Sequence, residues 1–347
     1  MASKIKFYSV ILAGGIGERL WPYSREDRPK QVIPFLNGES LLEQTINRCK
    51  LFSDQIFIIT SQAQKDLISR FVKSDECKVL VEPAGRNTAA AIIFSLLQIS
   101  KLDPNCIVGF FPADHYIPDS DVFASQIKKV VDLVSLENKI CLLGLKPKSA
   151  ATGYGYIECD LNDLENNQFL QIKKFHEKPK LEVAQQYVKD GNKFWNLGMF
   201  IAQINVFINE CKFCAPRVFD QVTDSIEQSD KSIYEQIEKI SIDYAVMEKT
   251  ENIIFLPVDF AWSDVGNLDV FLSIQNSMQS SKLQNVIEIN SFNNLIDVKD
   301  KLVALIGIEN LCVIEHENQL IVINRKDVEK IKDLRQLIKV KKSEKVV

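Results

Sequence analysis

The sequence predicts an α/β protein built on a mostly parallel sheet with helices on both faces, followed by a small C-terminal β-helical piece. Apolar, β-rich runs alternate with helical patterns from Phe7 to Gly144, which is typical of strands joined by helical crossovers. The 347 residues, 46% of them hydrophobic, suffice for a large α/β domain with an appendage. Near the C-terminus the chain changes to short β-rich segments, whose regular spacing permits one or two β-helical coils.

Five apolar runs predict the core strands: FYSVILA, QIFIIT, KVLVE, CIVGFFP and ICLLG. Helical patterns separate them at Leu41–Cys49, Ala63–Phe71, Ala89–Ser100 and Val122–Leu133. In such sheets ligands bind beyond the carboxyl ends of the strands. We therefore expect the polar motifs that follow the first, third and fourth runs to converge on one edge.

Shorter β-rich pieces follow from about Thr152, namely GYGYIE, FLQIKKFHEK and FWNLGMFIAQ. We interpret them as excursions of the same sheet that build a second ligand pocket. The polar stretch Gln275–Gln284 is the predicted boundary, which gives domains of residues 1–280 and 281–347. The second domain carries VIEIN, LVALIGI, LCVIEH, QLIVIN and a basic helical tail.

Composition argues against several classes of protein. The net charge of −4 disfavours a nucleic-acid partner, because phosphate backbones demand a basic face. The sequence has no run of about 18 apolar residues for a membrane span, and the N-terminus lacks a signal-peptide cleavage pattern. We therefore expect a cytoplasmic protein with no nucleic-acid and no membrane partner.

Eight cysteines lie scattered through mostly apolar segments, which is the pattern of reduced, buried thiols. Only Cys211 and Cys214 form a C-x-x-C pair. With no second pair and three histidines in the chain, the sequence argues against a structural zinc site.

The stretch VILAGGIGERLWPYSREDRPKQ, residues 10–31, follows the first predicted strand. It contains no Gly-Lys pair for a P-loop, and Leu20 stands where a dinucleotide fingerprint needs its third glycine. What remains is a flexible turn at Gly14, Gly15 and Gly17, whose N–H groups can point at phosphate oxygens, with a guanidinium at Arg19 able to grip them. An ordinary βα connection is the alternative, but the cationic tail from Arg19 to Lys30 favours phosphate binding.

Two aspartates are candidates for a metal site. Asp114 ends CIVGFFPAD, and Asp264 lies in the tight turn AWSDVGN, where Trp262 and Gly266 would fix its direction. Mg²⁺ takes one or two carboxylates and completes its shell with phosphates and water. Each aspartate could instead be a helix cap or turn former. His115 invites a general-base role, but we favour a structural one.

Three further motifs offer polar groups. EPAGRNTAAA opens onto a helix that Asn87 or Thr88 could cap, while Arg86 and Asn87 could instead contact a base or phosphate. GYGYIE and FHEKPK supply an open backbone, a carboxylate and an ammonium, which suit a sugar phosphate. Glu177 and Lys178 could also be a solvated pair.

Together these motifs resemble those of the mannose-1-phosphate guanylyltransferases, in the sugar-nucleotide pyrophosphorylase superfamily. The matching segments are LAGGIGERLWPYSREDRPKQ, EPAGRNTAAAI, FPADHYI, TGYGYIE, FHEKPK, WNLGMF, IDYAVMEK and WSDVGN, in the family's order from residue 12 to 267. The resemblance implies a Rossmann-like nucleotidyltransferase sheet and a left-handed β-helix-like C-terminal domain. It also implies GTP and mannose 1-phosphate as substrates, a divalent cation such as Mg²⁺, and GDP-mannose and pyrophosphate as products.

The resemblance also assigns residues, carried over position by position. Nucleotide binding falls to Leu12, Ala13, Gly14, Gly15, Gly17, Glu82, Arg86, Asn87 and Thr88, and sugar-phosphate binding to Gly153, Glu177, Lys178 and Asn196. The catalytic set is Arg19, Lys30, Asp114, Lys178 and Asp264, with Asp114 and Asp264 as metal ligands. The attacking phosphate oxygen has a second pKa of about 6 and needs no base, so positioning and charge neutralisation suffice. We also expect a homodimer joined through the C-terminal domain.

Two positions depart from the family's pattern. Leu197 stands where a small residue is usual in WN-x-G, and Ala90 replaces a common proline. We expect Leu197 to face the core, because alternation along a regular strand would place it opposite Asn196. The alternatives are a nucleotidyltransferase for another sugar 1-phosphate and a non-catalytic regulatory subunit. The chain also lacks the histidines of a cupin-type isomerase domain after residue 267.

Overall fold

The computed structural model describes residues 5–72, 75–164, 168–278 and 285–344, and they form two compact units. The first unit takes its described residues from Met1–Gly14, Thr45–Ala113 and Ile117–Trp262. The second takes them from Gly15–Gln44, Asp114–Tyr116 and Ser263–Val347. The second unit therefore joins most of the glycine-rich stretch to the C-terminal part of the chain.

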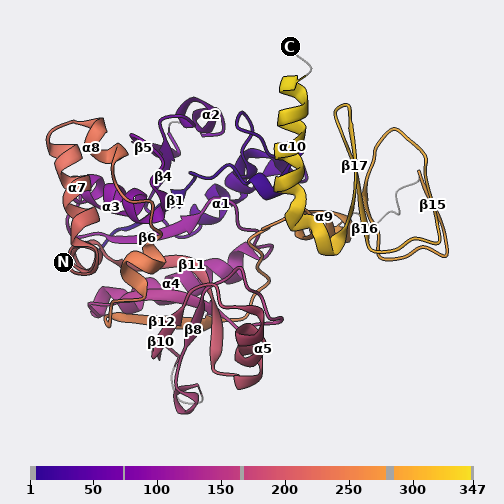
Figure 1. Ribbon diagram of the computed structural model, residues 1–347. Coiled ribbons are helices and arrows are strands. Elements are labelled where there is room, and N and C mark those ends of the chain that lie inside the picture. Colours follow the sequence, from indigo (N-terminus) through magenta and orange to yellow (C-terminus); the bar gives the residue numbers. More distant parts are fainter. Residues whose placement is uncertain (1–4, 73–74, 165–167, 279–284, 345–347) are drawn as a thin grey trace. The chain divides into compact units, whose positions relative to one another are not determined.

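A ten-stranded sheet is the scaffold of the first unit (Figure 1). Its main path runs β5-β4-β1-β6-β11-β7-β12-β9, where β11 is Lys193–Gln203 and β9 is Leu170–Gln171, with β8 (Tyr156–Glu158) and β10 (Lys174–His176) beside it. The five predicted core strands are confirmed as β1 (Phe7–Leu12), β4 (Gln55–Ser61), β5 (Cys77–Glu82), β6 (Ile107–Pro112) and β7 (Ile140–Leu145). The first four pair in parallel, and β12 (Ile253–Val258) pairs in parallel with β7. The carboxyl ends of β1, β5 and β6 thus lie at the same edge, as predicted.

Helices cover both faces of this sheet, and the alternation of side chains along β1 shows how. Tyr8 and Val10 join the core cluster that contains residues of α3, α6 and α7. Phe7 points the other way and contacts Phe52, whose ring also packs against Phe123 of α4. The α-helices of this unit are α2 (Lys65–Arg70), α3 (Asn87–Ser100), α4 (Ser120–Leu136), α5 (Leu181–Asp190), α6 (Ile204–Cys214), α7 (Pro216–Glu227) and α8 (Lys231–Glu235), while α1 (Leu41–Cys49) contributes its second half.

The predicted excursions belong to the same sheet. β8 (Tyr156–Glu158) pairs with β10 (Lys174–His176), and the short β9 (Leu170–Gln171) pairs with β12. The long β11 (Lys193–Gln203) lies between β6 and β7 and runs antiparallel to both, while its first residues also pair with β8. One strand therefore connects the central sheet to the excursion that carries FHEKPK.

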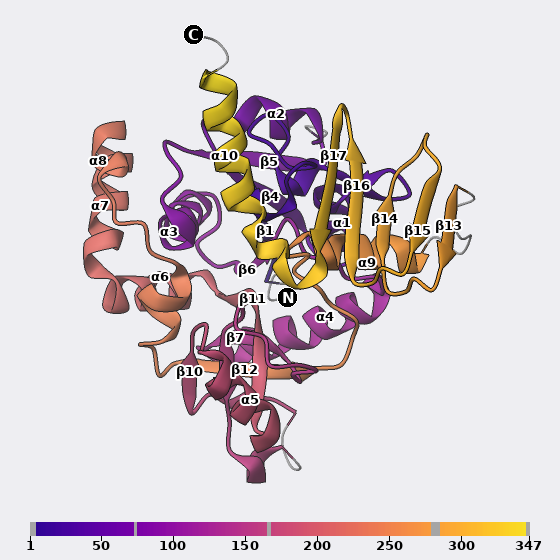
Figure 2. The ribbon, with the colours of Figure 1, turned by 45° about the vertical axis from the view of Figure 1, so that its right-hand side comes forward.

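The C-terminal strands of the second unit form a β-helical coil (Figure 2). β13 (Val286–Ile289) pairs in parallel with β15 (Val303–Ile306), and β14 (Leu295–Asp297) pairs in parallel with β16 (Leu311–His316). β17 (Gln319–Asn324) closes a hairpin with β16. The other strands and α-helices of this unit include β2 (Pro34–Leu36), β3 (Glu39–Ser40), α9 (Leu268–Met278) and α10 (Ile331–Glu344). Three short 3-10 helices lie at Glu18–Leu20, Lys30–Val32 and Arg325–Lys330.

The core of the second unit joins segments that are far apart in sequence. Leu20 and Trp21, directly after the glycine turn, cluster with Phe271 of α9 and with Ile321 and Ile331 near the C-terminus. The predicted boundary stretch begins inside α9, which runs to Met278, and residues 279–284 lie outside the described residues.

Candidate functional site

The predicted site residues fall into two groups. Those of the second unit are Gly15, Gly17, Arg19, Lys30, Asp114 and Asp264. Those of the first unit are Leu12, Ala13, Gly14, Glu82, Arg86, Asn87, Thr88, Gly153, Glu177, Lys178 and Asn196.

The three glycines of the turn differ in whether a side chain would fit at their position. Gly17 has a φ of +73°, and a Cβ there would lie 2.3 Å from the Cβ of Lys30, so only glycine fits. Gly14 and Gly15 are different, because a Cβ on Gly14 would meet only Glu82 Oε1 at 4.0 Å and one on Gly15 would meet nothing within 4 Å. These two positions leave their backbone open to a ligand, whereas Gly17 is required for the close approach of Lys30.

Lys30 links the two predicted metal ligands. Its side chain is 9% exposed, and Nζ donates to Asp114 Oδ2 at 2.8 Å and to the backbone carbonyl of Asp264. Burial acts to raise the pKa of Asp114, but the charge and hydrogen bond of Lys30, together with the electrostatic effect of His115, outweigh it and hold that pKa below its usual value. Asp114 is therefore ionised at neutral pH, with 36% of its side chain exposed.

Asp264 is held by its own turn. Its Oδ1 accepts a hydrogen bond from the backbone N–H of Gly266 at 3.1 Å, and a Cβ on Gly266 would lie 2.7 Å from Oδ2. Gly266 therefore leaves room for the carboxylate, as the sequence suggested. Among the described residues, no group of three or more His, Cys, Asp or Glu side chains could hold a metal. A Mg²⁺ site needs only one or two carboxylates when phosphates supply other ligands.

Arg19 pairs with a residue near the C-terminus. Its Nε lies 3.0 Å from Oε2 of Glu329, and both side chains are about half exposed. Glu329 Oε1 also accepts a hydrogen bond from Asn267 Nδ2 at 3.0 Å. Glu329 thus connects the glycine-rich segment to the turn that holds Asp264, and the sequence patterns gave no signal for it.

On the nucleotide side of the first unit, Glu82 ends β5 and is 4% exposed. The hydroxyl of Tyr234 donates to its Oε2 at 2.8 Å. Burial raises the pKa of Glu82 to about 7, although Tyr234 and the backbone N–H of Arg86 act to lower it. Nε of Arg86 is buried and has no hydrogen-bond partner in the described structure. A buried donor without a partner is unusual in folded proteins.

Of the two alternatives for this turn, a side-chain cap on the helix is not formed. α3 begins at Asn87, whose φ is +67°, and no side chain caps the helix. The Asn87 side chain accepts from the N–H of Thr88 at 2.8 Å, and Thr88 Oγ1 accepts from the N–H of Ile242 at 2.9 Å. The Thr88 hydroxyl therefore binds the backbone of Ile242, which is distant in the sequence, and not the N-terminus of α3.

On the sugar-phosphate side, Glu177 and Lys178 form an ion pair in which only the Lys178 side chain is largely exposed to solvent. The Glu177 side chain is 4% exposed and lies against Gly155, where a Cβ would be 2.5 Å from Oε2. Lys178 has a φ of +47°, a backbone conformation that costs free energy in a residue with a side chain. Around Gly153 there is open space, since a Cβ there would meet nothing within 4 Å.

Asn196 lies at a bulge in β11. The pairing with β7 shifts between Asn196 and Phe200, and Gly198 within this bulge has a φ of +65°. Asn196 Oδ1 accepts from the N–H of Gly198 at 3.0 Å, and Nδ2 donates to Asp243 Oδ1 at 3.0 Å. The strand is not regular here, so alternation does not place Leu197. Leu197 is nevertheless buried, with 1% exposed, as is Ala90.

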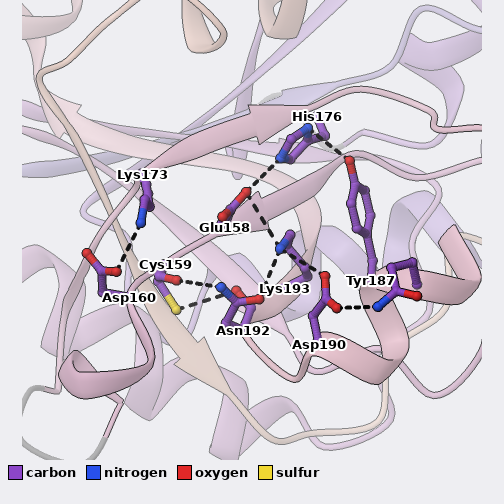
Figure 3. A network of polar contacts seen from close by, with 10 residues as sticks. Glu158, Cys159, Asp160, Lys173, His176, Tyr187, Asp190, Asn192 and Lys193 are labelled. Carbon is purple, nitrogen blue, oxygen red and sulfur yellow. Dashed lines mark hydrogen bonds and ion pairs between the residues drawn. The ribbon is translucent and has the colours of Figure 1, made fainter. Parts of the chain in front are cut away.

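A polar network fixes the strands that carry these residues (Figure 3). Glu158 Oε2 contacts His176 Nε2 at 3.0 Å and Lys193 Nζ at 3.6 Å, and the Tyr187 hydroxyl lies 3.0 Å from His176 Nδ1. Burial acts to raise the pKa of Glu158, but His176 and Lys193 hold it below its usual value. His176 directly precedes Glu177 and Lys193 opens β11, so the network sets the position of β10 relative to β11.

Sequence reasoning missed three residues of these clusters: Tyr234, Asp243 and Glu329. Asp243 lies in the matched segment IDYAVMEK, which had no role assigned to it. It opens a π-helical turn, Asp243–Met247, a rare form that is frequent at functional sites. Nothing in the local pattern marks Tyr234 or Glu329, whose partners are 152 and 310 residues away in the sequence.

Comparisons with known proteins agree with this arrangement. Residues 8–281 match the family described as Nucleotidyl transferase, and residues 284–339 match the MannoseP isomerase/GMP-like beta-helix domain. Mannose-1-phosphate guanylyltransferase 2 of Escherichia coli O157:H7 is 33% identical, over 95% of this chain and 73% of its own length. Mannose-1-phosphate guanylyltransferase RfbM of Salmonella typhimurium is 31% identical, over 96% of this chain and 73% of its own length.

A solved structure is also similar. The protein described as mannose-1-phosphate geranyltransferase from Thermus thermophilus has a TM-score of 0.85 and 26% identity, and the match covers 96% of this chain and 100% of that one. No helix in the described part of our chain is long and apolar enough to cross a membrane. The chain belongs to the nucleotidyl transferase family and, within it, to the mannose-1-phosphate guanylyltransferases.

Proposed function

We propose that this chain transfers GMP from GTP to α-D-mannose 1-phosphate, giving GDP-mannose and pyrophosphate. The cluster of Lys30, Asp114 and Asp264, in the same unit as the open turn at Gly15, carries the proposal. A buried ammonium and an ionised carboxylate, together with an open glycine backbone, suit a nucleoside triphosphate. The names of the relatives supply the sugar and the nucleotide.

The reaction needs positioned charges rather than a general base. An oxygen of the sugar phosphate attacks the α-phosphorus of GTP, and the bond from that phosphorus to the pyrophosphate oxygen breaks. The attacking oxygen is already ionised near neutral pH. Lys30 and Arg19 would balance the charge of the triphosphate, and Lys178 would bind the sugar phosphate.

We propose that Asp114 and Asp264 hold Mg²⁺ or another divalent cation. The donor set fits, because both are carboxylates of the same unit, Lys30 contacts a group of each, and Asp114 is ionised. The ion would neutralise charge on the phosphates. The Lys30 ammonium, which lies beside both aspartates, would add positive charge next to the phosphates.

The first unit supplies the hydrogen-bonding groups that would recognise the nucleotide and the sugar phosphate. The unpaired Nε of Arg86 and the carboxylate of Glu82 offer a donor and an acceptor for the nucleotide. Glu177 and Asn196 offer acceptors and donors for sugar hydroxyl groups. A transferase for a different sugar 1-phosphate would use the same arrangement, so the sugar rests on the relatives. A regulatory subunit without turnover is disfavoured, because Arg19, Lys30, Asp114 and Asp264 are all present.

A pyrophosphate-release assay over a matrix of four nucleoside triphosphates and several sugar 1-phosphates tests this proposal. We expect the highest kcat/KM for GTP with mannose 1-phosphate, and no turnover without a divalent cation. A preference for another pair would reassign the substrates. Tight binding of a sugar nucleotide with no turnover of any pair would instead support the regulatory alternative.

Two further proposals concern the state of the protein. All eight cysteines are free and buried, which favours a reducing compartment such as the cytoplasm. We also propose a homodimer joined through the C-terminal strands. Ile287 and Ile289 of β13 and Ile306 of β15 are each more than half exposed, and the register places Ile289 opposite Ile306.

A further inference from the structure

Asp243 lies where the two predicted substrate regions of the first unit meet. Its carboxylate accepts a hydrogen bond from Asn196 Nδ2 at 3.0 Å. The residue before it, Ile242, donates its N–H to Thr88 Oγ1 at 2.9 Å, and Ile240 accepts from the N–H of Ala89 at 3.2 Å. A single short segment therefore ties the start of α3, next to the nucleotide groups, to the amide of the sugar pocket.

The charges around Asp243 extend this connection. Burial, and then the negative charge of Glu177, raise the pKa of Asp243 to about 6, against the opposing effect of Lys178. Burial acts to lower the pKa of Lys178, but its pairing with Glu177 and the charge of Asp243 outweigh it and raise that pKa. Lys178, whose side chain is 56% exposed, is thus ion-paired with Glu177 and lies within the electrostatic influence of the Asp243 carboxylate.

A purely structural role would not need this charge. A neutral amide at position 243 could accept the same hydrogen bond from Asn196, without the cost of placing a second carboxylate close to Glu177. The carboxylate accepts the hydrogen bond that fixes the direction of the Asn196 amide. It also adds a negative charge that favours the charged form of Lys178. Because Asn196 Oδ1 is taken by the N–H of Gly198, both ends of this amide are set.

We propose that Asp243 is a positioning residue for the sugar 1-phosphate, acting through Asn196 and Lys178. The hydrogen bond from the neighbouring Ile242 N–H to Thr88 Oγ1 holds Asp243 at a fixed position relative to the nucleotide groups of the first unit. This inference rests on the proposed function, since it assumes that Asn196 and Lys178 contact a sugar phosphate. It assigns Asp243 to that substrate and not to the nucleoside triphosphate.

The test compares Asp243→Ala, Asp243→Asn and the control Glu248→Gln, which removes an exposed carboxylate from the same IDYAVMEK segment. We expect Asp243→Ala to raise the KM for the sugar 1-phosphate by roughly tenfold or more, with the KM for the nucleoside triphosphate within about twofold. Asp243→Asn keeps an acceptor for Asn196 but not the charge, so its effect should be intermediate. The control should match the wild type in both constants.

The measurements use whichever substrate pair the wild type turns over best. If that pair is not GTP with mannose 1-phosphate, the proposed function fails while Asp243 is still tested. An unchanged KM for the sugar phosphate in Asp243→Asn and Asp243→Ala would overturn the inference, as would equal increases for both substrates. If Asp243→Ala does not fold, Asp243→Asn decides alone, and a KM for the sugar phosphate equal to that of the wild type then overturns the inference.

Discussion

The turn around Asp264 shows how one glycine can serve a charged neighbour. Gly266 gives its N–H to the Asp264 carboxylate and leaves the space that a side chain would fill. Because Asn would keep the oxygen that accepts this hydrogen bond, Asp264→Asn should change the charge and not the turn. The substitution therefore separates a role in charge balance from a role in folding.

If Asp264 holds the divalent cation as proposed, Asp264→Asn should lower kcat on the order of 10³-fold, because the ligand loses its charge at the transferring phosphate. The melting temperature should stay close to that of the wild type. The same substitution at the exposed Asp259 is the control and should leave kcat unchanged. Near-normal turnover in Asp264→Asn would remove this residue from the metal site.

Leu197 raises a different question, because the family pattern has a small residue there and this chain has a large one. It is 1% exposed, so its side chain is packed in the protein and does not line an open pocket. Leu197→Ser should cost about 2–5 kcal/mol of stability through the cavity and the buried hydroxyl. The volume-conserving Leu197→Met should cost less than about 1.5 kcal/mol.

Selectivity is the second readout for this residue. The ratio of kcat/KM for mannose 1-phosphate to that for glucose 1-phosphate should be the same in Leu197→Ser and in the wild type. A changed ratio with an unchanged melting temperature would place the side chain against the sugar after all.

Among the elements, the short turn Glu18–Leu20 depends on the end of the chain. Leu20 is buried in the cluster that includes Ile331, Arg335 of α10 lies 3.3 Å from Glu18, and Glu329 pairs with Arg19. The periodic patterns predicted α10 but could not predict these contacts, since pairing between segments far apart in the sequence leaves no local periodicity. The sequence therefore predicts the phosphate-binding character of the glycine-rich segment, but not the C-terminal contacts that hold this segment in place.

A double-mutant cycle tests what Arg19 does. Arg19→Lys should lower kcat/KM for GTP by roughly tenfold or more, because lysine loses the fork that grips phosphate. Glu329→Gln should change stability by about 1 kcal/mol or less, as expected for an exposed ion pair. If Arg19 acts on the nucleotide, Arg19→Lys should cost the same factor in the Glu329→Gln background. Loss of that cost would mean that Arg19 serves mainly to hold Glu329.

Across the chain, the strands and most helices of the first half followed from hydrophobic patterns, because each carries its signal within a few residues. The place of β11 between β6 and β7 did not, since pairing is decided by contacts between distant segments. The same limit applies to the site. The motifs predicted Glu82, Lys178 and Asn196 as site residues. Tyr234 and Asp243 were found only from their hydrogen bonds to Glu82 and Asn196 in the structure.

The apolar face of β13 and β15 leads to the last prediction, which concerns association. Ile289 and Ile306 are 53% and 70% exposed and lie opposite each other in the parallel pair. Such adjacent apolar side chains on a strand face favour contact with a second copy. Sedimentation velocity of the wild type should therefore show a dimer at micromolar concentration. Ile289→Asp should weaken the dimer by roughly tenfold or more, because it would place a charge in the apolar contact.

The control for this experiment is Leu136→Asp, at a residue of α4 that is 86% exposed on the first unit. It also places a charge on an exposed apolar side chain, but away from β13 and β15, and should leave the dimer intact. The face is excluded as the dimer contact if Ile289→Asp sediments like the wild type, or if both variants dissociate equally. If the wild type is monomeric at every concentration tested, the proposed homodimer is wrong. Dissociation of Ile289→Asp alone would assign association to the C-terminal strands, where the register of β13 and β15 already sets the two isoleucines side by side.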